Sequence, residues 1–239
     1  MTWALEVADL QAGYPQAVVV HDLSLRVGVG EIVALTGLNG AGKTTTLLTL
    51  AGILPALGGT VSLFGTRVTR RPAHLRARSG LVLVPESRAI CPQLSTLENL
   101  RLIRPNSSGM AIRDVLDLLP VLSPLLRRRA GLLSGGEQQT LALAKAFVAG
   151  PRVLMIDELS LGLAPVIVGE ILPLVRSLAA KSGVAVLLVE QHSHIAAAVA
   201  DRAYLLARGR IVAECAASEL TSRRDLADVG RTASGEATK

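Results

Sequence analysis

The chain has 239 residues, of which 50% are hydrophobic, 2% aromatic and 18% charged. A chain of this length can bury a core of Leu, Val, Ile and Ala that needs neither disulfides nor a structural metal, so we exclude a mainly disordered protein. The net charge of +6 comes from scattered arginines without interleaved aromatic residues, and the densest run, at 127–129, is expected on a solvated helix face. No nucleic-acid partner is expected.

No segment carries the pattern of a membrane span or of a secretory signal. The apolar runs fall short of the roughly 20 uncharged residues that a spanning helix requires. The first thirty residues contain Glu6, Asp9 and Asp22 and no basic segment before an apolar run. We therefore expect a cytosolic chain, in which Cys91 and Cys215 stay reduced and act as small hydrophobic residues.

Short apolar segments alternate with helical patterns along most of the chain. Buried Val, Ile and Leu strands that alternate with helices favour an α/β core with a mostly parallel sheet. Residues 93–131 are mainly helical in pattern, with a polar break at RPNSSG (104–109), and suggest a helical insertion. Pro173 is expected to kink or shorten the helix that contains it. The predicted strands are 3–10, 18–27 (after a turn at Gly13-Tyr14-Pro15), 32–35, 60–64, 81–84, 153–157, 184–189, 203–207 and 210–213, and the predicted helices are 43–51, 135–149 and 165–180.

Residues 37–44, GLNGAGKT, match the pattern G-x-x-x-x-G-K-[ST] between a predicted strand and a predicted helix. The glycines let backbone N–H groups curl round a phosphate, and the helix adds the partial positive charge of its N-terminus. We expect Lys43 to reach the β- and γ-phosphates, Thr44 to ligate Mg²⁺ and Thr45 to donate to the α-phosphate. A plain glycine turn is the alternative, which the flanking elements disfavour. The predicted nucleotide ligands are Gly37, Leu38, Asn39, Gly40, Ala41, Gly42, Lys43, Thr44 and Thr45.

Two acids end the apolar segment VLMIDE at 153–158. Carboxylates at the C-terminal end of a parallel strand face the ligand crevice, although acids at strand ends are common and this one gains its meaning from the phosphate loop. Because neighbouring side chains on a strand point to opposite faces, we expect the two acids to have different roles. Asp157 is expected to hold the Mg²⁺ shell, and Glu158 to polarise the water that attacks the γ-phosphate.

The segment LLSGGEQQ at 132–139 begins a predicted helix. Ser134 and Glu137 have the spacing of a capping box, which is the purely structural interpretation. Gly135 and Gly136 lie in the first turn, where each glycine lowers helix stability by roughly 1 kcal/mol and no capping role requires it. Two glycines do allow a phosphate to approach the backbone N–H groups closely.

With this segment, the sequence resembles the ATP-binding-cassette (ABC) ATPases, whose signature motif is LSGGEQQ. The resemblance covers almost the whole chain. It implies an α/β phosphate-loop NTPase core with a mostly parallel sheet, an N-terminal antiparallel β subdomain and an inserted α-helical subdomain at about 88–150. It also implies a single domain over 1–222, while the polar composition of residues 223–239 predicts a flexible C-terminal tail.

In that family two subunits enclose two ATP molecules with Mg²⁺, head to tail. The resemblance therefore implies a second ABC ATPase subunit as partner, in a homodimer or a heterodimer. Ser134, Gly135 and Gly136 would then face the γ-phosphate held by the partner's Lys43. ATP binding would favour the closed dimer, and hydrolysis would release it.

Four segments resemble the ATPase subunits of branched-chain amino-acid importers, namely VPES (84–87), STLENL (95–100), SLGLAP (160–165) and VEQH (189–192). The likeness implies integral membrane permease subunits as partners, a periplasmic or extracellular solute-binding protein acting indirectly, and a peripheral position on the cytoplasmic side of the membrane. The implied solute is a branched-chain amino acid or a related molecule such as an amide or urea. Tyr14 would stack on adenine, and a turn tyrosine is the alternative.

Several positions depart from the usual family pattern. Glu86, which is also expected beside the nucleotide, stands where most of these ATPases have Gln. A phosphate charge would repel a carboxylate at this position, so Glu86 is acceptable only near Mg²⁺, near Arg88, or turned toward a membrane partner. We expect Glu86 to act mainly in coupling the ATPase to its membrane partner, more than in nucleotide affinity. Gln191 replaces the usual switch histidine and is expected to donate to the γ-phosphate, while His192 is not an automatic substitute. Leu159 replaces a proline, so the loop after it is expected to be less rigid.

Two other function classes fit parts of the sequence. A non-transport cassette ATPase acting on nucleic acid or ribosomes would contain two fused cassettes or a long coiled coil, and this chain shows one phosphate loop, one signature and no heptad run between them. A phosphate-loop kinase or GTPase would not need LSGGEQQ. The expected catalytic residues are Glu158, Gln191 and Lys43, and the expected Mg²⁺ ligands are Thr44, Asp157 and Glu86.

Overall fold

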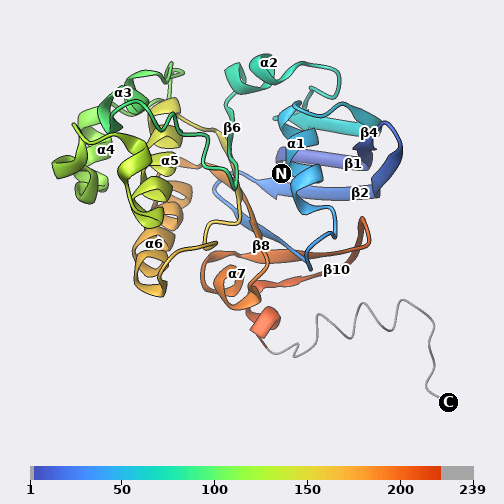
Figure 1. Ribbon diagram of the computed structural model, residues 1–239. Coiled ribbons are helices and arrows are strands. Elements are labelled where there is room, and N and C mark those ends of the chain that lie inside the picture. The colour runs from blue at the N-terminus through green and yellow to red at the C-terminus, as the bar shows by residue number, and fades with distance from the viewer. Residues whose placement is uncertain (1–2, 222–239) are drawn as a thin grey trace.

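Two β-sheets and a group of helices form the part of the chain that the computed structural model describes, residues 3–221 (Figure 1). The N-terminal sheet is antiparallel and has the strand order β2-β1-β4-β5. Alternate apolar residues such as Leu5, Val7, Leu23 and Leu25 are buried, as expected for a sheet packed on one face. The strands are β1 (Trp3–Tyr14), β2 (Ala17–Gly28), β4 (Ala56–Leu63) and β5 (Thr66–Arg67).

The second sheet has the order β10-β9-β3-β8-β7-β6 and is parallel except for the antiparallel pair of β9 and β10. Every residue of β3 and of β7 is buried, which explains why these segments are continuous apolar runs in the sequence. The predicted α/β core with a mostly parallel sheet is thereby confirmed. The strands are β3 (Ile32–Thr36), β6 (Leu81–Val84), β7 (Val153–Asp157), β8 (Ala185–Glu190), β9 (Arg202–Ala207) and β10 (Arg210–Ala216).

The two faces of β7 belong to different hydrophobic clusters. Val153 and Met155 pack with α1 and the N-terminal sheet, whereas Leu154 and Ile156 pack with α5 and α6. Because successive side chains of a strand point to opposite faces, both faces of the parallel sheet are covered by hydrophobic side chains. In Figure 1, α3 to α6 gather on one side of the structure, away from β1, β2 and β4. The helices are α1 (Lys43–Ala51), α2 (Ala73–Arg78), α3 (Thr96–Arg101), α4 (Ile112–Leu118), α5 (Gly135–Ala149), α6 (Pro165–Ser182) and α7 (Ser193–Val199), with 3-10 turns η1 (Pro120–Leu125), η2 (Ala130–Leu132) and η3 (Ala217–Thr221).

Most predicted elements agree with the structure to within a few residues, and α1, α5, β6 and β7 agree at both ends. The first hairpin differs, because β1 continues to Tyr14 and the turn lies at 15–16 instead of at the glycine. Gly13 pairs with Val18 in the ladder, and a Cβ on Gly13 would overlap the carbonyl of Ala17. This glycine therefore allows a close approach of two strands.

Three short elements escaped prediction, namely β5, α2 and α7. None has more than seven residues, which is too few for a helical or strand period to stand out. The region 93–131 contains only the short helices α3 and α4 and two 3-10 turns, because Pro120 and Pro124 join the polar break in interrupting it.

Two further expectations about helices are corrected in part. Of the expected kink or shortening at Pro173, the shortening does not occur, because α6 runs from Pro165 to Ser182. Proline has no backbone N–H, so Pro173 leaves the carbonyl of Gly169 without its helical hydrogen bond. Both residues lie on the exposed side of the helix, where water can bond that carbonyl. The arginines at 127–129 are exposed as expected but lie in a turn after η1 rather than on a helix.

Within residues 3–221, no helix is both long enough and apolar enough to cross a bilayer. The predicted tail at 223–239 lies outside the described residues.

Candidate nucleotide-binding site

The loop between β3 and α1 takes its shape from glycines. Gly40 and Gly42 have φ values of 78° and 106°, in the left-handed region that favours glycine. A Cβ on Gly37 would overlap the carbonyl of Leu206 in β9, so glycine is needed there for packing. The helix α1 begins immediately after the loop, at Lys43. The loop thus places its backbone at a helix N-terminus, which is the geometry that binds phosphate.

The turn between β9 and β10 supports this loop from behind. Gly209 donates its N–H to the carbonyl of Ala41 at 2.9 Å, and its own carbonyl accepts from the N–H of His21 at 2.8 Å. A Cβ on Gly209 would overlap the carbonyl of Val19. Segments from the beginning and the end of the described chain therefore meet at the phosphate loop.

The side chain of Lys43 lies inside the loop and is only 5% exposed. Its Nζ donates to the carbonyl oxygens of Gly37 at 2.9 Å and Leu38 at 3.3 Å, and lies 3.5 Å from Oε1 of Glu158. The ammonium group therefore stands between the loop and Glu158, which follows β7. This position suits a cation that contacts phosphate oxygens.

The two acids at the end of β7 differ in backbone conformation. Asp157 is the last residue of the strand, whereas Glu158 has left it, with a left-handed φ of 49°. The expectation of different roles assumed that both acids lie on one strand, and that assumption is wrong, because Glu158 lies beyond the end of β7. The N–H of Glu158 donates to the carbonyl of Val189 at 2.9 Å, which fixes the bend against β8. A left-handed non-glycine residue is costly and is often found at functional sites.

The carboxyl group of Asp157 is 2% exposed, and its Oδ1 is buried without a hydrogen-bond partner. Burial raises its pKa to about 6, although a hydrogen bond from Thr44 lowers the pKa, and the nearby carboxylates of Glu158 and Glu86 raise it further. An unpartnered carboxylate oxygen beside a threonine hydroxyl is a donor set that fits Mg²⁺. Within residues 3–221 no group of three or more His, Cys, Asp or Glu side chains could hold a metal unaided. Mg²⁺ usually completes its shell with phosphate oxygens and water, so this donor set fits the metal together with a nucleotide.

A hollow of about 470 Å³ joins these residues, a volume within the usual range of small-molecule sites. Gly37, Leu38, Ala41 and Asp157 are predicted residues that do not line it. Val19 and Leu161 line it without having been predicted, and of these only Leu161 lies in a segment that the sequence singled out. The lining residues are Tyr14, Val19, Asn39, Gly40, Gly42, Lys43, Thr44, Thr45, Glu86, Glu158, Leu161 and Gln191.

The residues that depart from the family pattern also have definite positions. Glu86 is exposed and lines the hollow, and within residues 3–221 it forms no ion pair with Arg88. Gln191 lines the hollow as well. His192 lines a different hollow and lies beside His194, with ring centroids 5.7 Å apart. The structure thus places Gln191, and not His192, beside the phosphate loop.

The LSGGEQQ segment does not contribute to the hollow of its own chain. Ser134 caps α5 as predicted, since its Oγ accepts from the N–H of Glu137 and its N–H donates to the Glu137 carboxylate. A Cβ on Gly135 would come no closer than 3.4 Å to its neighbours, and the same distance holds for Gly136. These are ordinary contacts, so packing within the chain does not require either glycine. Ser134 is exposed.

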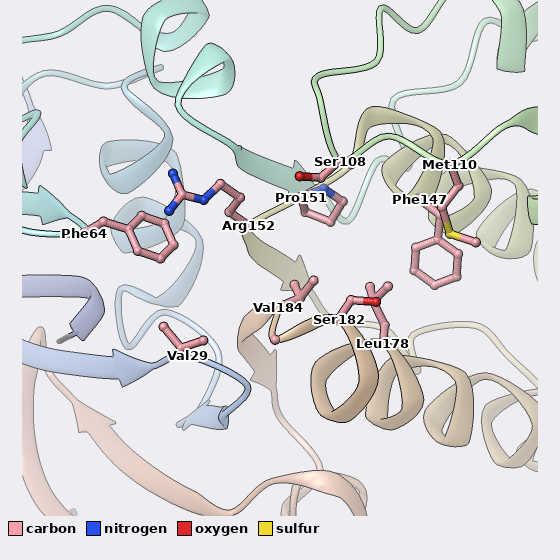
Figure 2. Close-up of a pocket in the computed structure, with 12 residues that line it drawn as sticks. Val29, Phe64, Ser108, Met110, Phe147, Pro151, Arg152, Leu178, Ser182 and Val184 are labelled. Carbon is pink, nitrogen blue, oxygen red and sulfur yellow. The ribbon is translucent and has the colours of Figure 1, made fainter. Parts of the chain in front are cut away.

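A second hollow of about 400 Å³ lies away from these residues, between the ends of α5 and α6 and the N-terminal sheet (Figure 2). The guanidinium of Arg152 lies 3.7 Å from the ring centroid of Phe64 at its border. No predicted site residue lines this hollow. This hollow is therefore separate from the predicted nucleotide site.

Comparison with known proteins decides the family. A family model described as ABC transporter matches residues 20–160, which include the phosphate loop, the signature and both acids. The chain belongs to the ABC transporter family. This confirms the resemblance inferred from the sequence, and with it ATP binding and ATPase activity in transport.

Several relatives cover most of this ABC transporter ATPase. The high-affinity branched-chain amino acid transport ATP-binding protein BraG of Pseudomonas aeruginosa is 40% identical over 203 residues, 83% of this chain and 87% of that protein. The probable branched-chain amino acid transport ATP-binding protein LivF of Archaeoglobus fulgidus is 34% identical over 90% of this chain and 93% of its own length. The lipopolysaccharide export system ATP-binding protein LptB of Escherichia coli is 33% identical over 90% of this chain and 92% of its own length.

Solved structures agree on the fold. A nucleotide-free ATP-binding cassette from an ABC transporter matches with a TM-score of 0.83 and 23% identity, covering 96% of this ABC transporter ATPase and 98% of that chain. The α/β architecture described above is therefore that of the cassette fold.

Proposed function

We propose that this chain is the ATP-hydrolysing subunit of an ABC importer, energising uptake of a branched-chain amino acid or a related small polar solute through a membrane permease. One observation carries the catalytic part, namely that Lys43 Nζ lies 3.5 Å from Glu158 Oε1 in a hollow that also contains Thr44 and Gln191. The 40% identity to BraG supports the solute class.

In this proposal the triphosphate of ATP lies along the phosphate loop, with Lys43 on its β- and γ-phosphates. Thr44, Asp157 and Glu86 would hold Mg²⁺, which would supply positive charge to neutralise the phosphate oxygens. Glu158 accepts a hydrogen bond from the attacking water, which orients the water for in-line attack. Gln191 donates to the γ-phosphate, and Tyr14 at the rim stacks on adenine.

A second ATPase subunit, identical or related, completes each site. The exposed Ser134 and the two glycines after it, which packing does not require, would meet the γ-phosphate bound to the partner's Lys43. The closed dimer would sit peripherally on the cytoplasmic side of the membrane and move the permease, while a solute-binding protein delivers the solute outside. Glu86, exposed on the loop after β6, is placed to sense that motion.

Lipopolysaccharide export is the second candidate, because LptB is 33% identical over a similar share of the chain. The two candidates share the ATP chemistry and differ in the transported molecule and in the direction of transport. Identifying which molecule stimulates ATP turnover distinguishes them.

Glu158→Gln tests the catalytic proposal. The amide keeps the shape of the carboxylate but is a poor acceptor for the water proton, so ATP should bind normally and trap a dimer that wild-type enzyme forms only transiently. Glu170→Gln, an exposed acid on α6, is the matched control and should behave as wild type. Hydrolysis by Glu158→Gln at the wild-type rate would refute the assigned role.

The solute is tested by purifying the chain from membranes with the permease that accompanies it. ATP turnover in vesicles is then measured with leucine, urea, an aliphatic amide or lipopolysaccharide. Stimulation by leucine, urea or the amide supports import of a small polar solute, and stimulation by lipopolysaccharide alone would overturn it.

A further inference from the structure

A strained turn follows Glu86 on the loop after β6. Arg88 and Ala89 are consecutive residues with left-handed φ values of 64° and 48°. Neither is glycine, so this conformation persists only where surrounding contacts hold it. The strained conformation of this turn therefore lowers the stability of the fold, and other contacts must offset that cost.

The contacts that hold the turn come from α5, the helix that begins with the signature glycines. Nε of Arg88 donates to Oε1 of Gln139 at 3.2 Å, and Nη1 donates to Oε1 of Gln138 at 2.8 Å. Nζ of Lys145, on the same helix, donates to the carbonyl of Ala89. The helix thus holds the turn through a side chain on one residue and the backbone of the next.

The tip of Arg88 also lies close to the first residue of α5 and to the loop after β7. Its Nη2 is 3.6 Å from where a Cβ on Gly135 would be, and 3.9 Å from where one on Gly162 would be. No ion pair of Arg88 is found within residues 3–221. Its partners are neutral amides, whose bonds can be exchanged more easily than those of a charged pair.

A buried unsatisfied group lies beside this contact. The side chain of Gln139 is 3% exposed, and its Nε2 has no hydrogen-bond partner. Asp157 Oδ1 is the other such atom in the described part of the chain, and the proposed Mg²⁺ would account for it. A buried unpaired donor next to a strained turn is expected of a segment that has a second arrangement.

We propose that Arg88 is a positioning residue that transmits movement of the Glu86 loop to α5, and so sets the position of Ser134. Glu86 lines the nucleotide hollow, and the turn at 88–89 follows it directly. A change at Glu86 when ATP binds would move the turn, and Arg88 would carry that movement to the signature of the same chain. The inference rests on the proposed function only in assigning Ser134 to a partner's nucleotide, since the link itself lies within one chain.

Hydrogen exchange in a dilute, monomeric chain tests the link without any partner. Glu158→Gln serves as the parent, so that ATP with Mg²⁺ is not consumed. In this parent, ATP should change the exchange rate of the backbone amides at 138–142 by roughly threefold or more, as expected for a local opening equilibrium that the ligand biases. Adding Arg88→Ala should abolish that change while a fluorescent ATP analogue still binds within about twofold of the parent affinity.

The control replaces an exposed arginine of the same helical region, Arg113→Ala on α4, and should keep the full response. A second variant, Gln138→Met with Gln139→Leu, removes both acceptors and the unpaired donor while keeping similar side-chain volume. It should lose the response as Arg88→Ala does, because Arg88 then has no acceptor on α5.

An ATP response that survives in Arg88→Ala, or is missing in the parent, would overturn the inference. A failure of the proposed function appears elsewhere, as a missing dimer at high concentration or stimulation by another solute, and leaves these exchange rates unchanged.

Discussion

The carboxylate of Glu190 accepts two hydrogen bonds from Ser160, one from its backbone N–H at 3.0 Å and one from its hydroxyl at 2.9 Å. Glu190 is the last residue of β8, is 1% exposed and immediately precedes Gln191. Ser160 immediately precedes Leu161, and both Leu161 and Gln191 line the nucleotide hollow. A buried carboxylate therefore fixes two walls of the site relative to each other, even though Leu159 removes the proline that usually stiffens the loop.

Ser160→Ala should lower the free energy of unfolding by about 1–3 kcal/mol, because the buried carboxylate loses one of its two donors. Urea unfolding of the variant and of the wild type at pH 8 measures the difference. An unchanged midpoint with an unchanged denaturant slope would show that the hydroxyl bond contributes nothing.

Glu190→Gln is a separate prediction about pH. Burial raises the pKa of Glu190, against the hydrogen bonds from Ser160 that lower it. A raised pKa means that the folded state holds the proton more tightly, so this contribution to stability is present at low pH and lost as pH rises through the folded pKa. The glutamine keeps an acceptor and has no charge, so it should be more stable than wild type at pH 8, with the gap closing toward pH 4. A gap that is constant with pH in urea titrations would contradict this.

Asp157→Asn should also stabilise the chain at neutral pH. The pKa of Asp157 is about 6 against an ordinary 3.8, chiefly because the carboxyl is buried. The stability that its protonated form provides is fully present below pH 4 and lost as pH rises through 6, and a pKa higher by about 2 corresponds to roughly 3 kcal/mol. Thermal or urea unfolding at pH 4 and pH 8 should show a gain for the asparagine variant only at pH 8. The same variant should lose Mg²⁺-dependent ATP hydrolysis, so equal stability at pH 8 or retained activity would each count against the assignment.

Tyr14→Ala should weaken ATP binding by about 1–3 kcal/mol, because a base loses its stacking partner. The ring is 48% exposed at the rim of the hollow, so its removal should cost little stability. Tyr14→Phe keeps the ring and should bind ATP as wild type does. The affinity for inorganic triphosphate, measured by competition, reports the contribution of the phosphates without the base. If Tyr14→Ala weakened the binding of ATP and of inorganic triphosphate equally, adenine stacking would be ruled out.

Arg76→Met should destabilise the chain by at least about 3 kcal/mol. Arg76 is 2% exposed, and its guanidinium bonds to four backbone carbonyls, two in the last turn of α1 and two in the loop before α2. The methionine removes all four bonds, although the carbonyl of Thr49 still accepts from the N–H of Gly52. Arg78→Met, exposed on the same helix, is the control and should stay within about 0.5 kcal/mol of wild type. Equal unfolding midpoints for the two variants would show that the buried bonds are not stabilising. The four acceptors are the carbonyls of Thr49 (2.8 Å), Leu50 (2.7 Å), Thr69 (2.7 Å) and Arg71 (2.9 Å).

The phosphate loop and the acids at the end of β7 were predictable because each lies in one continuous segment whose residue types identify it. The backbone conformation of Glu158 was not predictable. Nothing in its residue type predicts a left-handed conformation, and the strand pattern predicted an extended one. The contacts of Arg88 with Gln139, and of Glu190 with Ser160, join residues far apart in the chain. Neither amides nor serines have a spacing that foretells such pairs, so only the folded arrangement reveals them.

The bond between Gly209 and Ala41 has a consequence for how the protein is made. A ribosome releases the N-terminal residues first, so the phosphate loop emerges long before the β9–β10 turn that supports it. The nascent chain should therefore be unable to form its finished nucleotide cradle until β9 and β10 have been synthesised. Newly made ATPase would thus remain inactive until that point.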